Sequence, residues 1–556
     1  MKKVSILLII MLLATILLTS CKLPEEMGKA EEKQELDSVL NKNKDDVMDS
    51  GPVRRGTLKL FSTKPDNLNP VLTNNIYIQN ASKMVFESLV KLDKKQKPVP
   101  MLAEKWEVSP DGLMWTFYLK QNIQWHDKMP FSSEDVEFTI ATILNPASNS
   151  VYRKNIENIT TFASIDRNTF RIALKKPNSF TPELMTFPII PKHYYVGEDV
   201  IKSQRNMKPV GTGPYKFLEY QENSVIKFIM NENWWNSKNN EKNAPELPYI
   251  HDVEVKIFDN VKDSLSAFQT RDIDSTVIMT GDSSKFSGRT DLTIKKFPSN
   301  HFEFIAFNLS NPILSDKVVR QAIAHAVNKT KLIDDILPGD AIASDLPVIP
   351  DTWLYDTNVL NYTPSPSKAK ELLIQNGWKE ENEVLRKRIN GINTALELEI
   401  LVNEDNETRF KAATAISEQL KAAGINLKVR KLPWEDEFKL INSRKFDMVL
   451  LGSTTTSIPD ISFLYSSSEI ASGRNISGYS NKSVDTYLEQ MSTENDSSYK
   501  KALFLNMKSM INDEVPYIGL YFYNHAMLYN KKVKGELDPY LWDIMNNMTK
   551  WYIPVG

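Results

Sequence analysis

The order of hydrophobic patterns between residues 396 and 451 constrains the fold of this 556-residue chain more than any other feature. Residues 396–402 and 425–432 alternate apolar and polar side chains, as strands with one buried face do. A third strand is expected over residues 446–451, with an unbroken apolar run from Met448 to Leu451. Helical patterns separate the three strands. This β-α-β-α-β order predicts an α/β fold with a parallel sheet and right-handed crossovers.

The two helical patterns have the apolar stripes of surface helices. In the first, Ala413, Ile416 and Leu420 fall on one face, and Gly424 is a natural stop after the last turn. The second is short and begins at Trp434. Both helices are therefore expected to pack one side against the sheet.

A row of neutral hydroxyl groups follows the third strand. After Gly452 the chain reads Ser-Thr-Thr-Thr-Ser over residues 453–457, with no charge. Ligands of open α/β sheets bind in the crevice beyond the carboxyl ends of the strands, so we expect a binding surface here. The alternative for the threonines is a Ser/Thr turn whose hydroxyl groups bond within the turn and bind no ligand. The alternative for Trp434 is packing within its helix. The candidates from this crevice are Thr454, Thr455, Thr456 and Trp434, with Asp460 for any cationic group.

The N-terminus has the pattern of a secretory signal. Two lysines precede an apolar run over residues 4–18, which is short for a membrane span. The run leads into "LTSC", whose Cys21 is the only cysteine in the chain. This tetrapeptide resembles the bacterial lipobox, which implies a lipid on Cys21 and cleavage before it. An ordinary signal peptide or an uncleaved anchor are the alternatives. Residues 22–50 are polar and indicate a solvated tether.

Composition and motifs exclude several kinds of function. The formal net charge is −2 and no block of basic residues occurs, so we expect no nucleic-acid partner. One cysteine allows neither an intrachain disulfide nor a cysteine-based zinc site. The chain lacks GxSxG, HExxH and P-loop motifs, and its six histidines are scattered. We therefore predict no catalytic residues, no metal and no cofactor, and a protein that is not an enzyme.

Several segments resemble one family, the extracytoplasmic solute-binding proteins of ABC transporters in the oligopeptide, dipeptide and nickel-binding group (family 5). The longest, residues 85–140, contains "PMLAEKW", "DGLMWTFYL" and "WHDKMPFSSEDV". Further matches follow in the expected order, and the resemblance covers about residues 56–529. These matches are "GTGPYKF", "LSDKVVRQAIAHAVNKTKLI", "SPSKAKELLIQNGW" and "GYSNKSVDTYLEQ".

The resemblance implies a two-lobed, periplasmic-binding-protein-like α/β fold of type II. It belongs to the large peptide-binder class, in which lobe I carries an extra subdomain. Mapped onto this chain, the expected parts are a signal peptide over 1–20, a tether over 21–54, lobe I over 55–300, lobe II over 301–516 and a return to lobe I over 517–556.

The same resemblance implies a function in import. A lipid-anchored, monomeric subunit would capture an oligopeptide or similar small solute between its lobes outside the cytoplasm. It would then deliver the solute to a membrane permease with its ATPase. Asn308 lies near the expected lobe crossover, and Tyr479 and Asn481 lie in a family-like loop facing the cleft. All three are therefore candidate ligand-binding residues.

One departure from the family leaves the cargo open. Peptide binders of this family often place an Asp after the strand, in a pattern like W-x-A-D-Y-x-x-P, where it pairs with the peptide ammonium. Here Thr456 is aligned with that Asp, and Asp460 is a possible substitute. An oligosaccharide or a metal–chelate complex is the alternative cargo. A signalling receptor or extracellular chaperone without its own permease is the alternative role.

Overall fold

The computed structural model describes residues 51–238, 248–279, 283–356, 362–382 and 384–554. The predicted signal peptide, Cys21 and most of the predicted tether lie outside these residues. Within them, no helix has both the length and the apolar character needed to cross a membrane.

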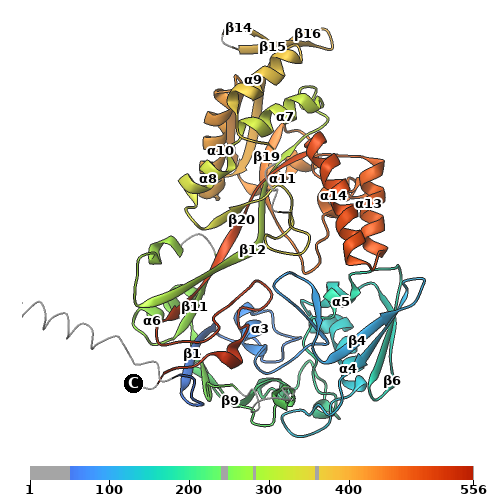
Figure 1. The fold of residues 1–556 in the computed structure, drawn as a ribbon, viewed down its shortest axis with the longest axis vertical. Coiled ribbons are helices and arrows are strands. Elements are labelled where there is room, and N and C mark those ends of the chain that lie inside the picture. The colour runs from blue at the N-terminus through green and yellow to red at the C-terminus, as the bar shows by residue number, and fades with distance from the viewer. Residues whose placement is uncertain (1–50, 239–247, 280–282, 357–361, 383, 555–556) are drawn as a thin grey trace, which may run out of the picture.

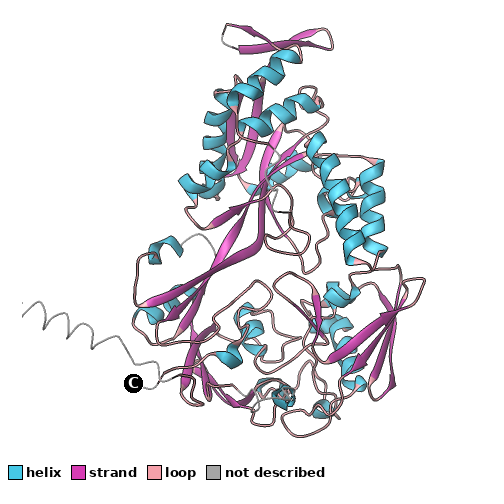
Figure 2. Cartoon of the chain, viewed as in Figure 1, coloured by secondary structure: helices cyan, strands magenta, loops and turns pink. Residues whose placement is uncertain are grey.

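One mixed sheet runs through the middle of the molecule (Figure 2). Three of its strands are parallel, with β17 paired to β18 and to β19, so the predicted parallel arrangement is confirmed. The remaining neighbours pair antiparallel. The strand order is β11 (Ser275–Ile278), β20 (Tyr517–Asn530), β12 (Leu292–Phe307), β19 (Met448–Thr454), β17 (Glu397–Asn403) and β18 (Asn426–Leu432), with β13 (Ala341–Ala343) also on β20.

Two long strands, β12 and β20, connect the two halves of the molecule (Figure 1). They pair from Leu292 with Asn530 to Ala306 with Tyr517, and their register shifts twice. Below them lies the first lobe, which comprises the elements up to β11 and the residues after β20. Above them lies the second lobe, which comprises the elements from α7 (Lys317–Ala326) to α14 (Ser497–Glu514).

Helices cover both faces of the second lobe's sheet. Ile305 and Phe307 of β12 pack toward α7, α8, α9 and α10, whereas Phe304 and Ala306 pack toward α11, α13 and α14. The alternation follows from the period of two along a strand. These helices are α7 (Lys317–Ala326), α8 (Lys329–Ile336), α9 (Pro366–Gln375), α10 (Glu407–Lys421), α11 (Trp434–Asn442), α13 (Lys482–Thr493) and α14 (Ser497–Glu514).

The first lobe contains two four-stranded sheets. Helix α4 (Ser133–Leu144) contacts the second sheet, and a capping box at Ser132 and Asp135 begins this helix. One sheet has the order β1 (Thr57–Thr63), β10 (Asp252–Phe258), β9 (Val225–Met230) and β8 (Tyr215–Gln221). The other has the order β4 (Ala103–Val108), β5 (Met114–Leu119), β7 (Thr169–Leu174) and β6 (Ile159–Asp166).

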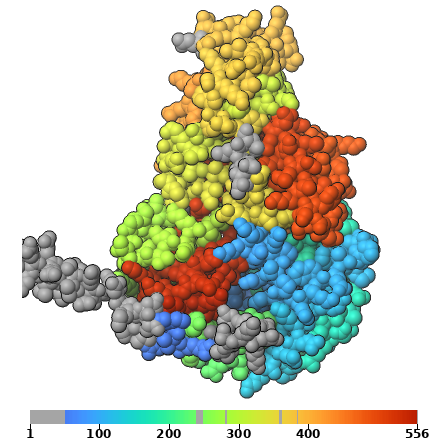
Figure 3. All heavy atoms as spheres, viewed as in Figure 1, coloured from blue at the N-terminus to red at the C-terminus, as the bar shows by residue number. Residues whose placement is uncertain are grey.

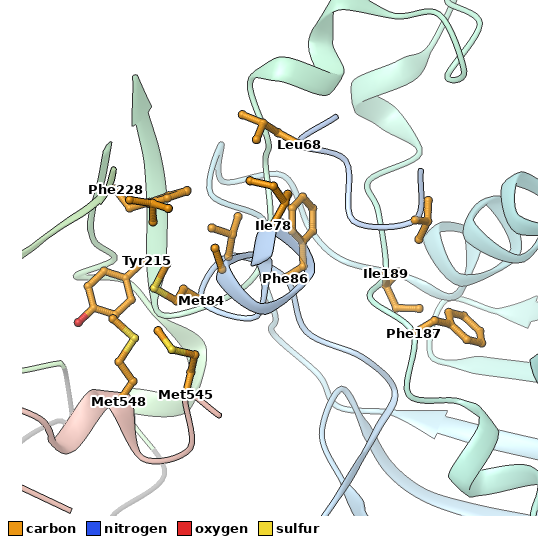
Figure 4. Packing of buried hydrophobic residues seen from close by; sticks show 14 of the residues in the cluster. Leu68, Ile78, Met84, Phe86, Phe187, Ile189, Tyr215, Phe228, Met545 and Met548 are labelled. Atoms are coloured by element: carbon orange, nitrogen blue, oxygen red, sulfur yellow. The ribbon is translucent and has the colours of Figure 1, made fainter. Parts of the chain in front are cut away.

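The C-terminal segment completes the core of the first lobe. Met545 and Met548 come from the end of the chain and lie beside Tyr215 and Met84 in the same buried cluster (Figure 4). The C-terminal segment is therefore part of the core of the first lobe, although the lobe boundaries predicted near residues 300 and 516 stay a prediction.

Smaller elements complete the structure. The antiparallel sheet of β14, β15 and β16 lies at the far end of the second lobe (Figure 1). These elements are α3 (Ile76–Ser82), β2 (Val90–Leu92), β3 (Pro98–Pro100), α5 (Thr181–Leu184), α6 (Val261–Gln269), β14 (Lys379–Glu381), β15 (Val384–Ile389), β16 (Ile392–Ala395) and α12 (Ser462–Tyr465).

Candidate functional site

A cavity of about 700 Å³ lies between the two lobes. Its volume is within the range of small-molecule sites, about 300–1,000 Å³. Both crossing strands and both lobes contribute to its wall. The lining side chains that the argument uses are Lys83, Glu87, Asn300, His301, Thr456, Ser457, His525 and Asp543.

Two histidines face the cavity from the crossing strands. The ring centroids of His301 on β12 and His525 on β20 are 6.4 Å apart. Phe297 meets the His525 ring edge-on at 5.7 Å. Burial lowers the pKa of His525 to about 4, and the neighbouring His301 adds to this effect, so His525 is neutral at physiological pH. Within the described part of the chain, neither imidazole has a hydrogen-bond partner.

Glu87 places a buried carboxylate in the wall of the first lobe. It accepts hydrogen bonds from the indole nitrogens of Trp234 at 3.2 Å and Trp235 at 2.7 Å, and from the Thr212 hydroxyl at 2.7 Å. Burial nevertheless raises the pKa of Glu87 to about 7, because desolvation disfavours the charged form more than these donors favour it. A cationic group entering the cavity would favour its ionised form.

The C-terminal segment supplies a second carboxylate, that of Asp543. The Lys83 ammonium donates to the backbone carbonyl of Trp542 at 2.7 Å and thereby fixes this segment against the first lobe. Although Lys83 is exposed as a whole, desolvation by the surrounding protein lowers the pKa of its ammonium, and the nearby Asp543 carboxylate opposes that shift.

The hydroxyl row begins at the carboxyl end of β19, as predicted. Thr454 is the last residue of β19 and pairs with His301. The Thr455 amide donates to the Asn300 carbonyl at 2.9 Å, and the Asn300 side chain donates to the Thr455 carbonyl at 3.0 Å. Thr455 is therefore buried, and its backbone groups are hydrogen-bonded to Asn300 of β12. Thr456 instead lines the cavity.

Gln96 connects the hydroxyl row to the first lobe. Its side-chain amide donates to the carbonyls of Thr456 at 3.2 Å and Ser457 at 2.9 Å. Near it, the backbone amide of Trp353 in the second lobe donates to the Lys95 carbonyl at 2.9 Å. Figure 3 shows this approach, with blue atoms of the first lobe against yellow atoms of the second.

The alignment of the family's Asp needs a correction. In the pattern W-x-A-D-Y-x-x-P the Asp stands four residues before the Pro. Counting back from Pro459 reaches Thr455, so the assignment to Thr456 is one residue too late. Neither threonine carries a charge, and the inference that the carboxylate is missing at this strand end is unchanged.

Three of the sequence candidates lie away from the cavity and have structural contacts. The Asn308 side chain donates to the carbonyls of Arg444 at 2.9 Å and Phe446 at 2.8 Å. Tyr479 is 2% exposed, within the core of the second lobe. Asn481 caps α13 with its side-chain oxygen. These three side chains therefore have structural roles within the second lobe and do not line the cavity.

The other two candidates are also outside the inter-lobe cavity. Trp434, the first residue of α11, is 47% exposed and packs against Phe438 with ring centroids 5.6 Å apart. Asp460 accepts from the Ser462 amide at 2.8 Å and lines a different hollow. Of the ligand candidates from sequence, only Thr456 lines the cavity between the lobes.

Glu87, His301 and His525 line the cavity but were not among the residues predicted from the sequence. Glu87 lies inside the family-like segment over residues 85–140, and this position was the one feature of the sequence that could have pointed to it. The two histidines are 224 positions apart in the sequence and meet only through the pairing of β12 with β20. No group of three His, Cys, Asp or Glu side chains suited to a metal occurs among the residues that the structure describes.

Comparisons with known proteins agree on one family. Residues 97–473 match the family model described as bacterial extracellular solute-binding proteins, family 5. The oligopeptide-binding protein AppA of Bacillus subtilis is 24% identical, over 87% of this chain and 90% of that protein. The dipeptide-binding protein of Escherichia coli is also 24% identical, over 85% of this chain and 91% of its own length.

Solved structures show the same fold. The ABC transporter substrate-binding protein CtaP of Listeria monocytogenes superposes with a TM-score of 0.70 at 23% identity, covering 90% of this chain and 99% of that one. The α/β, two-lobed, type II periplasmic-binding-protein-like fold expected from the sequence is thereby confirmed, as is the family resemblance. The chain belongs to the bacterial extracellular solute-binding proteins of family 5.

Proposed function

We propose that this protein is the lipid-anchored substrate-binding subunit of an ABC importer, and that it captures a peptide between its lobes. The observation that carries the proposal is the cavity of about 700 Å³, whose wall is built by both lobes and both crossing strands. Closure of two lobes about such strands buries a ligand and replaces its hydration with fixed polar groups. The peptide-binding relatives support the choice of cargo.

The polar groups of the cavity suit a peptide. We assign the binding of its ammonium to the carboxylates of Glu87 and Asp543, which take the place of the missing Asp at the end of β19. Thr456, Ser457 and Asn300 offer neutral donors and acceptors for the peptide backbone. A charge-assisted bond in a poorly hydrated cavity is the strongest of these contacts.

The proposed location and partners follow from the N-terminal signal and the family. A lipid on Cys21 would hold the monomeric protein on the outer face of the membrane, where it delivers its ligand to a permease and ATPase. Transport rather than catalysis is its proposed role. Mass spectrometry should show the mass increase that acyl chains on Cys21 would add. The Cys21→Ala variant should lack this increase.

The cargo is tested by mass spectrometry of small molecules released from the full lipoprotein, purified in mild detergent. A ladder of short peptides is expected. A glycan in their place would contradict the peptide assignment. Glu87→Gln should reduce the retained peptide, whereas Glu437→Gln, which changes an equally buried carboxylate in the second lobe, should not.

A metal complex is the second candidate cargo. The observation in its favour is the pair of imidazoles at His301 and His525, which have no other partner among the described side chains. Two imidazoles do not complete a coordination shell, so the chelator would supply the remaining ligands. Metal analysis of the same preparation, with His301→Ala and His525→Ala for comparison, separates this cargo from a peptide.

A further inference from the structure

Two exposed aromatic side chains lie together on α11 of the second lobe. Trp434 and Phe438 are one helical turn apart, each is 47% exposed, and their ring centroids are 5.6 Å apart. Among the residues that the structure describes, Tyr499 is the only other exposed aromatic side chain. Neither ring of the pair lines the inter-lobe cavity. An exposed Trp–Phe pair is typical of a surface that another molecule covers, because the cores of protein interfaces are enriched in aromatic residues.

The segments that follow two neighbouring parallel strands bring carboxylates to the same place. β17 and β18 pair up to Asn403 and Leu432, so both strands end at one edge of the sheet. The Glu404 amide donates to the Leu432 carbonyl at 2.8 Å, which places the loop after β17 beside the start of α11. The parallel strand β19 ends at this edge too, and the residues after it line the inter-lobe cavity. The exposed side chains at this edge form a surface that we call the aromatic–acidic patch: Glu404, Asp405, Trp434, Glu435 and Phe438.

The patch carries three carboxylates and no cation. Within the part of the chain that the structure describes, these carboxylates form neither a side-chain hydrogen bond nor an ion pair. The lysines on either side of α11's aromatic pair already have partners, Lys431 with Glu407 at 2.9 Å and Lys439 with Asp436 at 3.0 Å. Two further exposed lysines of the adjoining elements form no ion pair with the patch: Lys411 of α10 and Lys428 of β18. The surface is therefore apolar at its centre and negative around it.

We propose that the aromatic–acidic patch binds a cationic segment of a partner protein. Arginine or lysine side chains of that segment lie over the Trp434 and Phe438 rings, whose negative faces attract a cation. Their charges pair with the carboxylates of the patch. Arginine fits best, because its planar guanidinium can stack on an aromatic ring and bond to a carboxylate at the same time. This interaction goes beyond the proposed function and does not depend on the identity of the cargo.

The charge of the patch disfavours other occupants. Its three carboxylates would repel an anionic lipid surface and a nucleic acid alike. A second copy of the chain in a symmetric dimer would bring the same negative surface to the contact, so like charges would face each other. Tighter closure of the first lobe onto the two rings is the remaining alternative, and crosslinking separates it from a partner protein.

Photo-crosslinking in intact cells tests the proposal. The full chain, made at its normal level in its native cells, carries Phe438→p-benzoylphenylalanine, and mass spectrometry identifies the residues that this side chain captures. The expected result is a segment of another protein that is rich in arginine or lysine. The same photoreactive residue at Tyr499, the third exposed aromatic position, should not capture that segment.

Charge reversal shows whether the carboxylates hold the partner. Glu404→Lys combined with Glu435→Lys should lower the crosslink yield at least about tenfold, because like charges then face each other. Glu418→Lys combined with Glu489→Lys is the matched control, at exposed carboxylates of α10 and α13 outside the patch, and should leave the yield unchanged. All four positions are exposed, so a folding defect does not explain a loss. Peptide retention should be the same in both double variants, so failure of this interaction is distinguishable from failure of the proposed function.

Four results would overturn the proposal. The first is that no other protein is captured at Phe438. The second is capture of first-lobe residues of the same chain, which would show that lobe closure covers the rings. The third is capture of a second copy of the chain, or of an acidic or uncharged segment. The fourth is equal crosslink yield from the charge-reversed patch and its control.

Discussion

Arg409 at the start of α10 donates two parallel hydrogen bonds to the Glu303 carboxylate of β12, from Nε to Oε2 at 2.8 Å and from Nη2 to Oε1 at 3.0 Å. The pair lies directly beside Gly452, where an added Cβ would collide with both side chains. It therefore fixes the helix to the sheet at the end of the second lobe that faces the first.

Arg409→Met should destabilise the protein by about 3–5 kcal/mol, because Glu303 would remain as a buried, unpaired carboxylate. Chemical denaturation measures the change. The control is Lys439→Met, which breaks the exposed pair with Asp436 and should cost less than about 1 kcal/mol. Equal effects of the two substitutions would refute the importance of burial.

Gln96→Met should loosen the contact between the lobes. The substitution keeps the length of the side chain but removes the donor that bonds to the carbonyls of Thr456 and Ser457. We expect a larger radius of gyration in small-angle X-ray scattering and weaker ligand binding, with little loss of stability. An unchanged radius of gyration in the ligand-free protein would show that Gln96 does not hold the lobes together.

The pKa of Glu87 predicts a stability that falls as the pH rises. Its folded value of about 7 lies above the ordinary value of 4.5. Between these values the folded protein binds one more proton than the unfolded chain, so the free energy of unfolding decreases by up to about 1.4 kcal/mol per pH unit. Glu87→Gln should flatten this decline between pH 5 and 7 in denaturation curves. A variant with the parent slope would contradict the assignment.

Asn481→Ala should reduce stability without changing ligand affinity. The Asn481 side chain accepts from the amides of Ser483 at 2.9 Å and Val484 at 3.3 Å and donates to Glu514 at 2.7 Å. Loss of a helix cap of this kind costs about 1 kcal/mol. Thermal denaturation and peptide titration of the same variant distinguish this structural role from the ligand-binding role expected from sequence.

The second lobe was the most predictable part of the fold. The helix expected before Gly424 is α10, and the φ of +79° at Gly424 marks the stop. Its apolar stripe of Ala413, Ile416 and Leu420 is fully buried. Local periodicity determines these features, because one helix face and one strand face meet the core.

The cavity was much less predictable, because its wall is assembled by long-range pairing. His301 and His525 meet only through the register of β12 with β20, which no local pattern specifies. Asn308 and Tyr479 illustrate the opposite error. Both have side chains suited to a ligand, yet the core of the second lobe uses them, and sequence does not show which side of a strand end faces the cleft.

Thr456→Asp should raise the affinity for peptides with a free amino terminus. Thr456 is exposed in the inter-lobe cavity, and its hydroxyl bonds only to the nearby Ile458 carbonyl at 3.2 Å in the described structure. A new charge-assisted bond of about 1.5–3 kcal/mol corresponds to roughly a ten- to hundredfold gain. N-acetylated peptides should gain nothing. Thr454→Asp, two residues earlier and outside the cavity lining, is the control, and an equal gain from it would remove Thr456 from the site.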